Sequence, residues 1–364
     1  MEAAGYFASN YVAARTRFRE LATQCGAHQR EHPIDTKGPG GVTLSLDTAY
    51  LGAAAPEALV VITSGTHGIE GFAGSALQQL FLSEFAADWS NARHGVLLIH
   101  AINPYGFAFL RRANENNVDL NRNALDKFPG PANPAYAKID AWLNPPSAPG
   151  AVDTFYLQAI WKVLHNGMPA VKQAIAGGQY EFPRGIFYGG QKREQSLSIL
   201  DSILRDKKFA RASRVLHLDL HTGLGPSGTY KLLVEFERTS DAYRELQQAF
   251  GEAEVEANDP EETVAYHATG LLSEQTVQLF PTARVYPVVL EFGTHRLAKM
   301  IHMLCRENRL HFFGDPAGAS GQKLKRQFLE IFCPSAKIWR EQLIANGRKI
   351  YTQLARSWLN PRAA

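Results

Sequence analysis

Three short clusters of polar residues could carry chemistry, and each stands at or just after the end of an apolar run. His67 and Glu70 lie in GTHGIEG, His221 lies in HLDLHTG, and Glu291 lies in VVLEFGTH. A His-x-x-Glu pair places an imidazole and a carboxylate about one turn apart, so both side chains can bind one cation. His221 offers a third ligand, and three protein ligands with one open position are typical of a catalytic zinc site.

Other histidines near these clusters favour different interpretations. His28 and Glu31 repeat the His-x-x-Glu spacing, but they stand in the charged stretch CGAHQREHPID, which we interpret as a loop with no strand before it. His217 is interpreted as a core histidine or as one that supports a ligand from behind. Asp219 lies one strand period before His221 and could orient that imidazole.

A carboxylate and a group of arginines add further candidates. Glu291 ends an apolar strand, where an isolated carboxylate is costly to bury. It is either a salt-bridged strand-end residue or a general base that takes a proton from a metal-activated water. The stretch RRANENNVDLNRN contains Arg111, Arg112, Asn121 and Arg122, whose planar donors suit a substrate carboxylate or a developing oxyanion, with a solvated loop as the alternative.

Apolar runs alternating with helical patterns must position these side chains. The runs predict strands at 58–64, 95–102, 215–220, 230–236 and 285–292, and helical spacing occurs at 6–24, 74–85 and 241–257. This alternation predicts an α/β fold with a mostly parallel or mixed sheet covered on both faces. Ligands bind beyond the carboxyl ends of such strands, so the polar clusters would meet in one pocket. GLGPSG at 223–228 matches a dinucleotide motif, but the predicted strand after it argues against that use.

Two further regions complete the predicted organisation. The segment from about 126 to 213 interrupts the alternation with Pro and Gly clusters and a helical stretch, DTFYLQAIWKVLHNG, and we expect a lid-like insertion folded onto the sheet. Two helical patterns, 323–332 and 336–359, close the chain and are separated by Pro334. We expect residues 1–364 to form a single domain.

Composition excludes several classes of protein. The 364 residues carry 38 basic and 35 acidic side chains, a formal charge of +3, and the basic residues are scattered, which argues against a nucleic-acid or membrane-surface protein. There is no secretory signal pattern and no apolar stretch of membrane-spanning length. Three distant cysteines fit reduced thiols in the cytoplasm.

In order along the chain, the residues His67-Gly-Ile-Glu70, 118–123 (VDLNRN), Asp219-Leu-His221 and Leu290-Glu291-Phe292 resemble the zinc carboxypeptidase (M14-like) superfamily. The sequence is most similar to the DUF2817 branch, near the succinylglutamate desuccinylase and aspartoacylase group. The resemblance implies a three-layer α/β/α fold with a mixed, mainly parallel, about eight-stranded sheet. It also implies Zn²⁺ bound by His67, Glu70 and His221, with Glu291 as general base and acid.

The same resemblance implies roles for the arginine cluster. Arg112 falls where the family places the arginine that polarises the scissile carbonyl, with Arg111 as its adjacent alternative. Asn121 and Arg122 match the pair that binds the substrate carboxylate. The family often carries a mobile tyrosine before the catalytic glutamate, and Tyr266 in AYHATG is the nearest candidate, with Tyr188 and Tyr230 as alternatives.

The expected function is therefore zinc-dependent hydrolysis of an amide bond beside a free carboxylate, as in a carboxypeptidase acting on small peptides. Removal of an acyl group from an N-acyl amino acid is the alternative, in which Asn121 and Arg122 hold an acyl-side or side-chain carboxylate. The aspartoacylase group usually ends in a β-rich domain whereas this sequence ends in helical patterns, which leaves the leaving group and the substrate size open. A binding protein without catalysis on the same fold is a third hypothesis. The sequence leaves the oligomeric state, the natural substrate and any second metal open.

Overall fold

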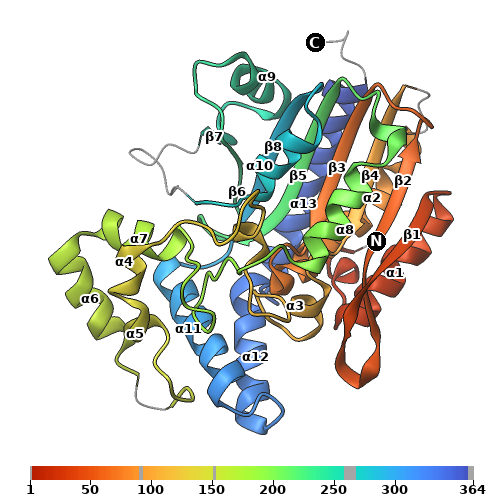
Figure 1. Ribbon diagram of the computed structural model, residues 1–364. Coiled ribbons are helices and arrows are strands. Elements are labelled where there is room, and N and C mark those ends of the chain that lie inside the picture. The colour runs from red at the N-terminus through yellow and green to blue at the C-terminus, as the bar shows by residue number, and fades with distance from the viewer. Residues whose placement is uncertain (1, 90–92, 151–152, 258–267, 360–364) are drawn as a thin grey trace.

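An eight-stranded mixed sheet runs through the molecule (Figure 1). The computed structural model describes residues 2–89, 93–150, 153–257 and 268–359. The strands are β1 (His28–Lys37), β2 (Thr43–Gly52), β3 (Ala58–Ser64), β4 (His94–His100), β5 (Arg214–Gly223), β6 (Tyr230–Val234), β7 (Val255–Ala257) and β8 (Arg284–Gly293). Their order across the sheet is β1-β2-β4-β3-β5-β8-β6-β7.

The four central strands, β4, β3, β5 and β8, are mutually parallel. β1 pairs with β2, β2 with β4, and β6 with β8 in antiparallel fashion, while β7 is parallel to β6. The central strands are apolar because both faces of the sheet are covered, and β3 (ALVVITS) is buried along nearly its whole length. The predicted α/β fold with a mixed sheet of about eight strands is confirmed.

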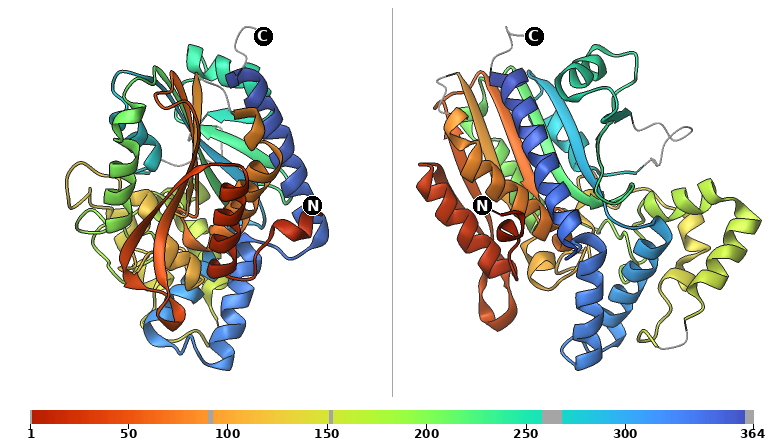
Figure 2. Two further views of the ribbon diagram at one scale, coloured as in Figure 1. Left: turned by 90° about the vertical axis from the view of Figure 1, so that its right-hand side faces the viewer. Right: turned by 180° about the vertical axis from the view of Figure 1, so that it is seen from behind.

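Helices form a layer on each side of the sheet, as the two views of Figure 2 show. One layer contains α1 (Tyr11–Gln24), α2 (Gly71–Glu84) and α13 (Lys337–Leu354), and the other contains α8 (Gln195–Leu204) and α10 (Leu272–Leu279). Helix α2 lies between the sheet and its two neighbours and is therefore buried almost throughout. Helix α13 approaches α2 closely at Gly347, where a Cβ atom would lie 2.6 Å from Leu77 Cδ2.

The remaining helices lie beyond the carboxyl ends of the central strands (Figure 1). They are α3 (Pro104–Ala108), α4 (Pro134–Ala137), α5 (Asp140–Leu143), α6 (Phe155–Asn166), α7 (Met168–Ala176), α11 (Leu297–Phe313) and α12 (Ala319–Phe332), whereas α9 (Asp241–Phe250) stands beside α13. The predicted insertion at 126–213 thus contains α4 to α7 and then returns to the sheet as α8. That the whole chain forms a single domain stays a prediction.

Several predicted boundaries were wrong for identifiable reasons. The helix expected at 241–257 ends at Phe250 because Gly251 takes a positive φ of 103°, and residues 255–257 form β7. His28 and Glu31 lie on the edge strand β1 and not in a loop, and Glu31 pairs with Arg15 and Arg19. By contrast, the strand expected after GLGPSG is present as β6, so no helix opens there as a dinucleotide site requires.

Among the described residues, no helix combines the length and the apolar character that a membrane span requires.

Candidate metal centre

The carboxyl ends of three adjacent parallel strands bring the polar clusters together. His67 and Glu70 follow β3 in a tight turn that includes a short 3-10 helix (Gly68–Glu70). His221 lies near the end of β5, and Glu291 is its register partner on β8. Neighbouring parallel strands end at the same edge of a sheet, so side chains from distant parts of the chain meet there.

His67, Glu70 and His221 form a compact and buried group of potential ligands. One ligand atom from each residue lies within 4.8 Å of the others. Glu70 Oε1 is 2.9 Å from His67 Nδ1, Glu70 Oε2 is 3.1 Å from His221 Nδ1, and the two Nδ1 atoms are 3.2 Å apart. Two imidazole nitrogens and a carboxylate directed at one point are the donor set that zinc prefers. These residues therefore fit a bound zinc ion.

The outer nitrogen of each imidazole faces a buried carboxylate. His221 Nε2 is 2.6 Å from Asp219 Oδ2, and Asp219 is in turn held by the hydroxyls of Thr63 and Thr66. His67 Nε2 lies 3.2 Å from Asp119 Oδ1, at ion-pair distance although not aligned as a hydrogen bond. Carboxylates in such positions fix the ring orientation of metal-binding histidines and leave the inner nitrogen for the metal.

The pKa values of the ligand residues reflect two opposing effects, burial of the side chains and the charged groups close to them. Burial raises the pKa of Glu70, but the charges and hydrogen bonds of His67 and His221 outweigh it and leave that pKa below its usual value. Burial lowers the pKa of His221, but Asp219 and Glu70 outweigh it and leave that pKa well above its usual value. A metal ion binds an imidazole through a nitrogen that carries no proton, so a metal and a proton would compete for His221.

A close backbone approach fixes the turn that carries His67 and Glu70. Gly68 packs on the backbone of residues 106–107, where a Cβ atom would lie only 2.1 Å from Gly106 C. The backbone carbonyls of residues 111–112 accept two hydrogen bonds from this turn. Gly68 N donates to Arg112 O at 3.2 Å, and Ile69 N donates to Arg111 O at 2.8 Å. The ligand turn and the segment bearing Arg112 are thereby held as one unit.

Arg112 reaches the ligand group with its side chain. Its Nη1 lies 3.5 Å from Glu70 Oε1, and its Nε donates to Asp119 Oδ2 at 3.0 Å. The guanidinium also lies 4.9 Å from the ring centroid of Phe187. The Arg112 side chain is 13% exposed, so its cation borders the site while its partners orient it.

Glu291 stands beside the ligands without being one of them. Its Oε1 accepts a hydrogen bond from Leu224 N at 2.7 Å, which orients the carboxyl group. Burial is the largest cause that raises the pKa of Glu291, and repulsion from the Glu70 carboxylate is the second; together they raise it to about 7. A carboxyl group in that range can both hold and release a proton at neutral pH.

Asn121 and Arg122 occupy the same end of the sheet. Asn121 borders the cavity next to His67, and its Oδ1 accepts from Leu272 N at 3.0 Å. Arg122 is fully buried, and its guanidinium donates to the backbone carbonyls of Asn121 at 2.6 Å and Ala176 at 2.7 Å.

Arg111 is not brought to this group. Its buried guanidinium pairs with Glu307 at 3.0 Å and donates to Asn117 at 2.8 Å, on the side of α11 and α12. Arg111 is therefore a structural ion-pair residue, and its expected role as a substrate-binding alternative to Arg112 is wrong. Tyr266 lies outside the described residues.

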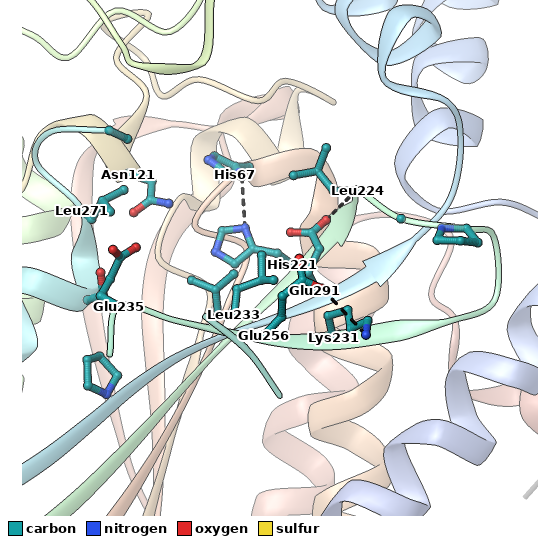
Figure 3. A pocket seen from close by; sticks show the side chains of 16 residues that line it. His67, Asn121, His221, Leu224, Lys231, Leu233, Glu235, Glu256, Leu271 and Glu291 are labelled. Carbon is teal, nitrogen blue, oxygen red and sulfur yellow. Dashed lines mark hydrogen bonds and ion pairs between the residues drawn. The ribbon is translucent and has the colours of Figure 1, made fainter. Parts of the chain in front are cut away.

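A cavity of about 190 Å³ opens beside the ligands, as Figure 3 shows. One wall consists of sheet residues from β6, β7 and β8 that point to the same face, namely Lys231, Leu233, Glu256, Val289 and Glu291. Leu224, Leu271 and Asn121 border it from the loops. A smaller cavity of about 70 Å³ on the side of Arg112 is lined by Glu70, Arg112 and Glu291 together with apolar residues, including Phe187, Met300 and Leu304. The ligand group therefore borders two cavities that each combine charged and apolar residues.

Sequence reasoning missed two contributors to this site. Asp119 stands within VDLNRN, yet its contacts with His67 and Arg112 depend on how the loop folds back over the ligand turn. Phe187, in the glycine-rich loop after α7, lies beside Arg112 and carries no sequence signal of its own.

The fold and the strand-end ligand group together define an α/β protein with a candidate metal centre. Residues 7–346 match the family model described as "Protein of unknown function (DUF2817)", so the chain belongs to the DUF2817 family. The resemblance to that branch noted from the sequence is confirmed. No protein with a curated description matches the chain.

Several solved structures show a distant likeness. The carboxypeptidase A from Helicoverpa armigera is 14% identical, with a TM-score of 0.43, over 88% of this chain and 73% of that one. The succinylglutamate desuccinylase from Chromobacterium violaceum is 16% identical, with a TM-score of 0.43, over 95% and 74%. The metallo-carboxypeptidase from Burkholderia cenocepacia is 14% identical, with a TM-score of 0.42, over 93% and 68%.

Replacing Asp119 by Asn is expected to weaken zinc binding by about 10- to 100-fold, the usual cost of losing a carboxylate that supports a ligand. Asn keeps the shape of the side chain but removes the charge that faces His67 Nε2. Competitive titration of zinc against a chelator would measure the change. The exposed Asp126→Asn serves as the control. An unchanged affinity in Asp119→Asn would remove this carboxylate from the support of the metal.

Proposed function

We propose that this protein is a zinc-dependent, M14-like hydrolase that cleaves an amide bond next to a free carboxylate, as a carboxypeptidase does. One observation carries the proposal: three zinc-type ligands converge within 4.8 Å, and the non-ligand carboxyl group of Glu291 stands beside them. His67, Glu70 and His221 would hold the ion. When bound, zinc supplies a Lewis acid that polarises a carbonyl and lowers the pKa of a water molecule.

The chain's own residues would then handle the proton and the charge. Glu291 takes the proton of the attacking water and returns it to the leaving nitrogen, a role that suits its raised pKa of about 7. Arg112 donates hydrogen bonds to the carbonyl oxygen as negative charge develops there. Asp119 and Asp219 keep the two imidazoles and Arg112 in position.

The substrate's free carboxylate is assigned to Asn121 and Arg122. Asn121 Oδ1 is used by Leu272 N, so its Nδ2 is the group with hydrogen atoms for an incoming carboxylate. The buried guanidinium of Arg122, whose Nη1 donates to the backbone carbonyl of Asn121 at 2.6 Å, supplies a positive charge next to it. The cavity of about 190 Å³ next to Asn121 then receives the adjoining side chain of the substrate.

Two other functions use the same residues differently. In a deacylase of N-acyl amino acids, Asn121 and Arg122 would bind a carboxylate of the acyl group or side chain. In a binding protein without catalysis, Glu291 would have no proton to transfer. A cytoplasmic location, and a small peptide or N-acyl amino acid as partner with neither nucleic acid nor membrane, stay predictions.

A substrate panel tests the proposal. Zinc-loaded protein would be assayed with short peptides that have a free C-terminus, the same peptides amidated, and N-acyl amino acids, before and after removal of zinc with a chelator. We expect zinc-dependent cleavage of the free peptides and at least about tenfold slower cleavage of the amidated ones, because a charged hydrogen bond is lost. Cleavage of N-acyl amino acids alone favours the deacylase, and no zinc-dependent cleavage contradicts both enzymatic hypotheses.

A further inference from the structure

Helix α6 presents a row of large apolar side chains to solvent. The exposed side chains are Tyr156 (45%), Leu157 (71%), Ile160 (59%), Trp161 (56%), Leu164 (78%) and, at the start of α7, Met168 (57%). The spacing 157, 160, 161, 164 places them on one side of the helix. These six residues are called the α6 face below. In Figure 1, α6 lies at the edge of the molecule, away from the sheet.

Helix α6 packs on the body through a narrow apolar stripe, formed by Phe155, Ala159 and Val163, and leaves its wider apolar side uncovered. Phe155 is buried and stacks on Trp142 at 5.0 Å and on His302 at 4.8 Å, which attaches the start of α6 to the body. Lys162 Nζ lies 5.7 Å from the ring centroid of Trp142 on the body and 5.6 Å from that of Trp161, at the border of the α6 face. A surface helix normally buries its apolar side and exposes its charges. A contiguous apolar patch left in solvent marks an interaction surface.

We propose that the α6 face is the contact between two copies of this chain. Charge is the first reason. Residues 154–177 contain no Asp or Glu, and their only Lys residues are Lys162 and Lys172, neither of which belongs to the α6 face. An uncharged face can meet its own copy across a twofold axis without like-charge repulsion.

Area is the second reason. The six side chains are large and about half to three-quarters exposed, so each has roughly 100 Å² of accessible surface that pairing could bury. The α6 face therefore offers about 600 Å² per copy. A pair buries about 1,200 Å² in total, the lower bound for a stable interface. The six side chains include one Trp and one Tyr, the residue types enriched among those that dominate binding energy.

A membrane surface is the alternative occupant, and the charges disfavour it. Helices that lie on anionic membranes display several Lys or Arg beside their apolar side. Here the one Lys of α6 lies against the rings of Trp142 and Trp161. The α6 face has apolar anchors without the outward cations that an anionic lipid surface would bind.

Pairing through this face would also brace the candidate substrate site. Helix α7 follows α6 directly and ends at Ala176, whose carbonyl accepts a hydrogen bond from Arg122 at 2.7 Å. Ala176 also borders the smaller cavity beside Arg112. A second copy resting on α6 would therefore contact the hairpin that holds Arg122, whose part in substrate binding rests on the proposed function.

Analytical ultracentrifugation of the full chain tests this proposal. We expect the wild-type protein to form dimers by the time its concentration reaches about 100 µM. In the double variant Leu157→Glu/Leu164→Glu, the dissociation constant of the dimer should rise by at least about tenfold. Because both leucines are exposed, the circular dichroism spectrum should stay as in the wild type, and the unfolding midpoint should match at concentrations low enough for both proteins to be monomeric. The control Val277→Glu/Ile338→Glu introduces the same charges at exposed apolar positions on α10 and α13 and should remain dimeric.

Three outcomes would overturn the proposal. They are a wild-type protein that is monomeric at about 100 µM, a dimer that survives in the α6 double variant, and a dimer lost equally in the control variant. Sedimentation with vesicles that contain an anionic phospholipid tests whether a membrane surface, and not a second copy, binds the α6 face. A monomer that binds them through Leu157 and Leu164 would assign the face to a membrane. None of these results depends on zinc or hydrolysis.

Discussion

Replacing Glu291 by Gln is expected to lower kcat by about 10²- to 10⁴-fold, the usual contribution of a positioned general base. The amide cannot accept the proton that the carboxylate would take from water in the proposed reaction. Its Oε1 can still accept the hydrogen bond from Leu224 N, so the side chain should stay in place. Glu291 is not one of the three ligands, so zinc content should equal that of the wild type. Steady-state kinetics and metal analysis of the same preparations give both values.

The exposed Glu20→Gln is the matched control, because it makes the same chemical change far from the site. It should leave kcat and zinc content unaltered. Wild-type turnover in Glu291→Gln would remove Glu291 from the mechanism. Loss of zinc in that variant would instead show that Glu291 is needed to hold the metal.

Replacing Glu307 by Ala is expected to lower the free energy of unfolding by about 3–5 kcal/mol, the usual cost of breaking a buried ion pair from one side. Glu307 Oε1 accepts from Arg111 Nε at 3.0 Å and from Lys325 Nζ at 2.6 Å, and all three residues are buried. Without the carboxylate, two cations remain in the interior. Urea unfolding would measure the change as a lower midpoint at constant slope.

The control for this variant is Glu341→Ala, which removes an exposed carboxylate paired with Lys337 at 3.8 Å. An exposed pair of this kind contributes little, so its effect should stay below about 0.5 kcal/mol. Equal stabilities of the two variants would contradict the structural role of the Glu307 network. That network matters for the site because Lys325 Nζ also donates to Phe109 O and Leu110 O, just before the segment that holds the ligand turn.

The central strands could be predicted because a strand buried on both faces requires apolar residues along its whole length. β3 and β8 are buried by helices on both sides, so they are continuous apolar runs. β1 was missed because it is an edge strand with a polar sequence, HQREHPIDTK. The alternation that predicts strands depends on one buried face, and most of the residues of β1 are partly or fully exposed.

The candidate ligands could be selected because their positions follow from local chemistry and strand ends. Choosing between Arg111 and Arg112 could not be done in that way. The two residues are adjacent, and Glu307, 196 residues later, holds Arg111 away from the site in an ion pair that Lys325 shares. The role of Asp119 was hidden for the same reason, since its partners His67 and Arg112 meet it only in the folded loop.

The insertion shows a further limit of sequence reasoning. Its helical stretch was predicted, and the apolar spacing of α6 is visible in the sequence. The helical spacing of the apolar residues shows that their side chains lie on one side of α6. It does not show whether another part of the protein covers that side. Only the structure shows that Lys162 lies near Trp142 while Leu157 and Leu164 lie in solvent.

Metal analysis of purified protein tests the central claim most directly. We predict one zinc ion per chain in the wild type and none in His67→Ala, because loss of one of three ligands breaks the site. The exposed His28→Ala, which shares the His-x-x-Glu spacing on edge strand β1, should retain zinc. Wild-type protein that takes up no stoichiometric zinc, or a His67→Ala variant that binds as much as the wild type, would contradict the account.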